Sequence, residues 1–168
     1  VHRATKGMRE VPILAAGGIC TGEQMAGAMA MGASGAWCAS VFLTTSEAET
    51  SEVVKEKMLA ATSKETVRSR SRTGKHSRQL QSDWTDAWES DGAPDPLPMP
   101  LQTMVSEPAL DKINKAAEVD HEGAKKLATY WVGQGIGLVD EKITAGQTVQ
   151  KFKEEFIEAY ERLNNFME

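Results

Sequence analysis

Two pairs of small residues could bind an anion: Gly17-Gly18 follows one short apolar segment of the sequence, and Ala39-Ser40 lies within a second, where the chain is expected to leave the strand. The first segment, residues 12–16, is a continuous apolar run, which is typical of a strand buried on both faces. The second, "GAWCASVFL" at residues 35–43, is interpreted as another such strand. Small residues after a strand let the backbone approach an anion closely, and the start of a following helix favours negative charge there. These residues therefore predict phosphate binding by backbone N–H groups.

The segment between the two predicted strands has the features of a helix. Thr21 is a suitable N-cap, Gln24 completes a capping box, and Gly32 stands where a helix commonly ends. A helix between two buried strands forms a βαβ unit, so the strands should be parallel. In (β/α)₈ barrels the loops after strands seven and eight commonly hold a phosphate. Tight turns and close helix packing alone would also explain the glycines, but two such turns in succession favour the phosphate site.

The rest of the chain is expected to be mainly helix and loop. Helices are predicted within residues 44–62, around residues 84–88 and within residues 106–130, and a polar, basic loop starts at residue 63. Five of the six prolines lie between residues 94 and 108 and predict an extended, irregular connection. The final helix should begin after Thr144, with Gln147 closing a capping box. One apolar face of that helix is formed by Val149, Phe152, Phe156, Tyr160 and Leu163.

Composition limits the classes of protein and partner. The chain has 168 residues, 40% of them hydrophobic, and a formal net charge of −5, which argues against nucleic acid or an anionic membrane as the main partner. It contains no apolar run of the roughly 20 residues that a membrane span needs and no apolar segment typical of a signal peptide. Cys20 and Cys38 lack the spacing of metal ligands and are expected to be inert, reduced thiols. We expect a cytoplasmic protein without a bound metal.

Four segments together resemble one enzyme family. The stretch "PILAAGGICTGEQMAGAMAMGASGAWCASVFLTTSEA" closely resembles the nitronate monooxygenase (2-nitropropane dioxygenase) family of flavin-dependent TIM-barrel enzymes. The segments "TGKHSRQLQSDWTDAWE", "PLPMPLQ" and "VGQGIGLV" continue the similarity along the chain. The resemblance implies an α/β fold, the C-terminal part of a (β/α)₈ barrel with its last two parallel strands and an inserted, mainly helical region. The implied divisions are residues 1–45 for the two βα units, 46–140 for the insertion and 141–168 for the closing helix.

By this resemblance the cofactor is FMN. The family places the flavin phosphate on the backbone of Gly17 and Gly18 and of Ala39 and Ser40. Ala39 stands where many members have glycine, which narrows the allowed backbone, and Ser40 keeps a hydroxyl that can donate to phosphate. Val41 stands where many relatives have an arginine, so no charged side chain is expected at this position. Gln134 and Gly135 match the segment that approaches the flavin ring.

No catalytic residue can be assigned from the resemblance. The family's general base is a histidine in an A-G-G-H context, and this sequence has no such context. His2, His76 and His121 are expected to be surface residues. The chain begins at Val1, almost directly ahead of a core strand, so we expect the remaining strands and the base to lie upstream. Two strands leave open edges, and we predict that the isolated chain is marginally stable or a homo-oligomer, and inactive.

The resemblance implies FMN-dependent oxidation of alkyl nitronates with dioxygen. An alternative is a flavin-dependent reductase of enoyl or CoA-linked acyl substrates, and a third is a catalytically silent fragment. A basic run bears on this choice, because it could meet the phosphates of a coenzyme A thioester. It could equally be a solvated loop, whereas RNA contact is disfavoured because no aromatic residues are interleaved with the charges. The run consists of Arg68, Arg70, Arg72, Lys75 and Arg78.

Overall fold

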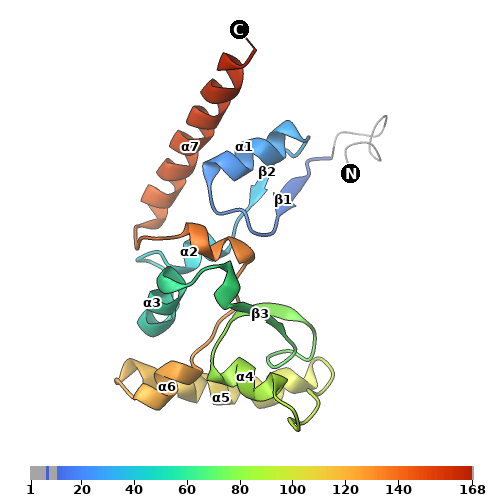
Figure 1. The fold of residues 1–168 in the computed structure, drawn as a ribbon, viewed down its shortest axis with the longest axis vertical. Helices are drawn as coiled ribbons and strands as arrows, with labels where there is room; N and C mark the ends of the chain where they lie inside the picture. Colours follow the sequence, from blue (N-terminus) through green and yellow to red (C-terminus); the bar gives the residue numbers. More distant parts are fainter. Residues whose placement is uncertain (1–6, 8–10, 168) are drawn as a thin grey trace. The chain divides into compact units, whose positions relative to one another are not determined.

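The computed structural model describes residue 7 and residues 11–167 of an α/β chain. The chain divides into two compact units (Figure 1). The first unit comprises Val1–Ala48 and Lys142–Glu168, and the second comprises Glu49–Glu141. Each unit has a two-stranded sheet of its own, parallel in the first and antiparallel in the second.

The first unit contains the predicted βαβ arrangement. Strand β1 (Leu14–Ala16) and strand β2 (Gly35–Trp37) are parallel neighbours, and helix α1 (Gly22–Ala30) connects them. The predicted capping box is present at the start of α1, because Thr21 and Gln24 exchange backbone–side-chain hydrogen bonds of 3.2 Å. Gly32 follows the helix with a φ of 106°, the left-handed conformation in which glycine commonly ends helices. The prediction of a parallel βαβ unit is therefore confirmed.

The prediction of a second strand over residues 35–43 is wrong for the second half of that segment. Strand β2 ends at Trp37, and the apolar residues that follow form the short helix α2 (Ser40–Leu43). The amide of Phe42 donates to the carbonyl of Ala39 at 3.0 Å, and Val41 is buried. A short apolar run does not distinguish a buried strand from a buried helical turn, so its pattern could not place this boundary.

The predicted C-terminal helix is confirmed as α7 (Ala145–Asn165), which lies along α1 (Figure 1). Gly22 permits this close packing, since a Cβ atom there would lie 2.1 Å from the carbonyl oxygen of Phe152. The amide of Gly22 also donates to Oε2 of Glu155 at 2.6 Å. At the start of α7, the amide of Ala145 donates to Oε2 of Glu47 at 2.9 Å. These bonds join the two sequence segments of the first unit.

The second unit has one antiparallel hairpin among helices. Its elements are α3 (Glu52–Ala60), η1 (Ser63–Glu65), β3 (Thr66–Ser69), β4 (Ser77–Leu80), α4 (Asp83–Glu89), α5 (Leu101–Glu118), α6 (Glu122–Leu127) and η2 (Gln134–Leu138). The prediction of a basic loop is wrong, because that segment forms the β3–β4 hairpin. Polar residues such as Ser69 and Gln79 fill buried positions of the hairpin and hydrogen-bond there. The apolar alternation by which a half-buried strand is recognised is therefore missing.

The helical prediction for residues 106–130 is right in type and wrong in its boundaries. Helix α5 begins earlier, at Leu101. Its first eight residues, up to Pro108, therefore lie in the segment 94–108 that was predicted to be irregular. A proline inside a helix removes one backbone hydrogen bond, and burial of side chains on α5, including Ser106 and Leu110, offsets that cost. The break between α5 and α6 lies at Asp120, whose φ is 70°.

Candidate functional site

The turns after β1 and β2 lie at the same edge of the parallel sheet. Ala16 pairs with Trp37 in the register of the two strands, so both chains leave the sheet at the same level. Gly17 and Gly18 have φ values of 102° and 74°, a backbone shape that side chains rarely permit. A Cβ atom built on Gly17 would meet no atom within 4 Å. The first predicted turn therefore has the backbone curvature and the open space that an anion needs.

The second turn leads into a helix at this edge. Ala39 is the N-cap of α2 and Ser40 is the first, buried residue of that helix. The start of a helix favours an anion, although in the four-residue helix α2 the amide of Phe42 already donates to the carbonyl of Ala39. Ala39 has a φ of −127° and a ψ of −62°, so this position does not need a left-handed glycine. Alanine in place of glycine is therefore accommodated at this position.

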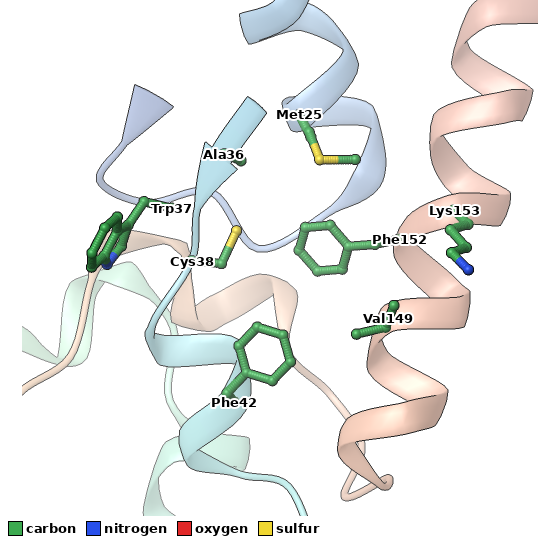
Figure 2. Close-up of a pocket in the computed structure, with 8 residues that line it drawn as sticks. All are labelled: Met25, Ala36, Trp37, Cys38, Phe42, Val149, Phe152 and Lys153. Atoms are coloured by element: carbon green, nitrogen blue, oxygen red, sulfur yellow. The ribbon is translucent and has the colours of Figure 1, made fainter. Parts of the chain in front are cut away.

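A pocket of about 430 Å³ lies in the first unit, beside β2 (Figure 2). The side chains of Cys38, Met25 and Phe152 point toward one another across it, whereas Lys153 points away and Trp37 lies on the other side of the strand. None of the four residues of the two turns lines this pocket, which offers few polar groups to orient a ligand. Its lining residues are Met25, Ala36, Trp37, Cys38, Phe42, Val149, Phe152 and Lys153.

The two cysteines of the first unit are poorly suited to nucleophilic chemistry. Burial raises the pKa of the Cys20 thiol to about 11, with a smaller contribution from the negative charge of an ionised Cys38. Burial also raises the pKa of Cys38. Since the thiolate is the reactive form, both thiols stay protonated and unreactive at neutral pH. This agrees with the prediction that they are inert.

Gln134 and Gly135 belong to the second unit, where they begin the 3₁₀ helix η2. The segment just before them runs beside β4, because the amide of Leu80 donates to the carbonyl of Tyr130 at 2.9 Å. The amide of Val132 likewise donates to the carbonyl of Arg78 at 3.2 Å. Gly135 is buried, so backbone bonds before the turn and packing within it hold this segment in place.

The basic run does not form one patch. Arg70 donates to the carbonyls of Gly74 and Pro96, and Arg78 donates to the hydroxyl and carbonyl of Thr66. Arg72 is buried and forms two hydrogen bonds with Glu107. Arg68 and Lys75 remain exposed. Three of the five cationic side chains of the run are therefore hydrogen-bonded to other groups of the protein.

The described residues contain no candidate for a histidine base or a metal site. His121 is exposed and caps α6, since its Nδ1 accepts from the amide of Ala124 at 3.2 Å. His76 is also exposed, and His2 lies outside the described residues. Within residue 7 and residues 11–167, no three His, Cys, Asp or Glu side chains are grouped to hold a metal ion. No helix in this part of the chain is long and apolar enough to cross a membrane.

Sequence reasoning missed the cluster in which Arg72 lies. The guanidinium of Arg72 is 3.8 Å from the ring centroid of Trp131 and 5.1 Å from that of Tyr130. Its carboxylate partner, Glu107, is on α5. These residues are far apart in the sequence, and no local spacing could have brought them together.

A family model described as nitronate monooxygenase matches residues 1–155. The chain is 52% identical to a Mycobacterium tuberculosis protein named putative monooxygenase Rv1533, over 94% of this chain and 42% of the relative. It is 25% identical to the nitronate monooxygenase of Paraburkholderia phytofirmans, over 93% of this chain and 41% of that protein. The chain therefore spans about two fifths of the length of these relatives.

Two solved structures are similar to this chain. A nitroalkane oxidase from Streptomyces ansochromogenes matches with a TM-score of 0.76 and 26% identity, over 92% of this chain and 42% of that one. FabK from Thermotoga maritima matches with a TM-score of 0.70 and 29% identity, over 94% of this chain and 48% of that one.

Proposed function

The chain belongs to the nitronate monooxygenase family, and on that premise we propose that it forms part of an FMN-dependent enzyme that oxidises alkyl nitronates with dioxygen. In this proposal β1 and β2 are the last two strands of a (β/α)₈ barrel. Residues 46–140 form an insertion, and residues 141–168 contain the helix that closes the barrel. The match to the nitroalkane oxidase over 92% of this chain supports the assignment.

The observation that carries the proposal is the pair of turns at one edge of the parallel sheet. Gly17 and Gly18 adopt positive φ angles, a Cβ atom at Gly17 would meet open space, and α2 begins at Ser40 after the neighbouring strand. Successive βα turns of this kind hold phosphate groups at the C-terminal face of barrels. We assign the flavin phosphate to the backbone of Gly17, Gly18, Ala39 and Ser40.

Each part of this chain then has a separate role. The two turns anchor the phosphate, and Gln134 with Gly135 approaches the flavin ring. When bound, FMN supplies the redox chemistry, accepting electrons from the nitronate and passing them to dioxygen. We assign no general base to the described residues, because the two histidines among them are exposed and one caps a helix.

The first test is a titration of the purified chain with FMN, followed by flavin fluorescence and absorbance. We expect saturable binding that Gly18→Val abolishes, because a β-branched residue is strongly disfavoured at a φ of 74°. Gly27→Ala is the matched control, since its Cβ would meet no atom within 4 Å and its helical backbone accepts alanine. Equal affinity in the wild type and Gly18→Val would refute the phosphate site. An absence of binding in the wild type would favour a silent chain.

A second candidate is a flavin-dependent reductase of enoyl or CoA-linked acyl substrates. Arg68 and Lys75 favour it, because both remain exposed in or beside the β3–β4 hairpin, where they can meet phosphate groups. Turnover of the native protein separates the two activities. Oxygen uptake with an alkyl nitronate supports the first. NAD(P)H-dependent reduction of an enoyl thioester without nitronate activity supports the second.

A further inference from the structure

Arg72 lies at the centre of a polar and aromatic cluster in the second unit. Its side chain is almost fully buried, with the residue 3% exposed. Nε and Nη2 donate to the two carboxylate oxygens of Glu107 at 2.7 and 3.0 Å, a bidentate pair. Nη1 is buried without a hydrogen-bond partner within the described residues. A buried charge with an unused donor is costly, so this arrangement needs a reason beyond general packing.

The planar guanidinium group of Arg72 also stacks against an aromatic ring. Trp131 stacks on it at 3.8 Å, and Tyr130 packs edge-on against Trp131 with ring centroids 5.6 Å apart. Trp131 is bridged through its backbone to Gln79 of β4 and is 37% exposed. One residue, Arg72, therefore connects α5 to the backbone segment that leads into η2.

Helix α5 holds Arg72 in place by its backbone as well as by its side chain. The Oγ of Ser106 donates to the carbonyl of Arg72 at 2.6 Å. The Nε2 of Gln102 donates to the neighbouring carbonyl of Ser71 at 2.7 Å. Together with the Glu107 pair, these bonds attach the end of the β3–β4 hairpin to one face of the helix. Arg72 is thus held rigidly enough to orient a neighbouring residue.

We propose that Arg72 is a positioning residue that fixes Trp131 and, through it, the start of the turn that carries Gln134 and Gly135. The inference rests on the proposed function, in which that turn approaches the flavin. Arginine suits this position because its planar group can pair bidentately with a carboxylate and stack on an indole at the same time. A lysine would keep the positive charge, but it could form neither the bidentate pair with Glu107 nor the stacking contact with Trp131.

The test compares Arg72→Lys with His76→Leu, which removes an exposed side chain from the loop of the same hairpin. Hydrogen exchange of the peptide spanning residues 129–138 is measured without flavin, and FMN affinity is measured by titration. For Arg72→Lys we expect about tenfold faster exchange in this peptide and about tenfold weaker FMN binding. We expect His76→Leu to change neither. The double variant Arg72→Leu/Glu107→Leu removes the pair without leaving a buried charge and should behave like Arg72→Lys.

A third variant separates positioning from stability. Leu110→Ala removes a buried side chain from the same helix and should lower the free energy of unfolding with little change in FMN affinity. Unchanged exchange in Arg72→Lys overturns the inference. So does faster exchange with wild-type FMN affinity, because Arg72 would then be purely structural. If the wild type binds no FMN, the proposed function fails, and the exchange data still decide whether Arg72 fixes the turn.

Discussion

The two units of the chain bury their apolar side chains to different extents. In the second unit Met58 and Ile136 are fully buried, and Leu80 and Leu110 are almost so. In the first unit Leu14 is 48% exposed and Trp37 is 67% exposed, although both lie in strands of its sheet. The register places these two side chains on the same face, since Ala16 pairs with Trp37 and lies two residues after Leu14. One face of the parallel sheet is therefore uncovered within the first unit.

The difference shows that hydrophobic content alone does not decide how complete a core is. The hairpin of the second unit contains many polar residues, yet Ser69, Ser71 and Gln79 are fully buried and hydrogen-bonded. The strands of the first unit are more apolar and less covered. Burying a polar group that is hydrogen-bonded costs little free energy. An apolar strand, by contrast, contributes to stability only when another element covers its side chains.

The largest expected effect is on the core of the second unit. Met58→Ala should lower the free energy of unfolding by about 3 kcal/mol, because it leaves a cavity at a fully buried position. Met31→Ala is the control in the first unit, where Met31 is 82% exposed, and should change it by less than about 0.5 kcal/mol. Urea titrations measure both. Equal losses would show that the two positions do not differ in burial as described.

The next effect is on the contact between α1 and α7. Gly22→Ala should destabilise the first unit by about 2 kcal/mol, since its Cβ would clash with the backbone of Phe152. Gly27→Ala, on the same helix in open space, should instead be neutral or stabilise it by up to about 1 kcal/mol. Thermal unfolding of the two variants gives the comparison. A stable Gly22→Ala variant would mean that the two helices can move apart at no cost.

A smaller effect depends on pH and on Cys20. The folded chain raises the pKa of this thiol from 9.0 to about 11, so the unfolded chain loses the proton first as pH rises. The contribution of this pKa difference to the free energy of unfolding is fully present below pH 9 and is lost as pH rises from 9 to 11. The wild type should lose about 1 kcal/mol more than Cys20→Ala between pH 8 and 10. Urea titrations at both pH values measure it, and identical losses would show that the thiol is not protected by burial.

The smallest expected effect on stability is at the uncovered sheet face. Trp37→Ser should change the free energy of unfolding by less than about 0.5 kcal/mol, because the ring is mostly exposed. It should weaken any self-association, which sedimentation velocity measures over a concentration series. Met31→Ser, exposed outside the strands, is the control. A large loss of stability in Trp37→Ser would show that the face is covered within the chain.

Local sequence signals identified the elements around the two turns that follow β1 and β2. Thr21 with Gln24 and Thr144 with Gln147 marked the starts of α1 and α7 because capping uses residues only three apart. The glycines at 17 and 18 indicated a turn that needs positive φ. The end of β2 and the β3–β4 hairpin could not be predicted, because there a short apolar run and a polar strand carry no distinctive period.

The order of strand, glycine turn and helix, the family and the charge balance can be read from the amino-acid sequence, because each depends on neighbouring residues or on composition. The three-dimensional fold was needed to show that Arg72 is buried between Glu107 and Trp131. It was also needed to show that Gly22 lies against α7 and that His121 serves as a helix cap. The contacts of Arg72 and Gly22 join residues far apart in the chain. They depend on the packing of whole elements, which no local spacing encodes.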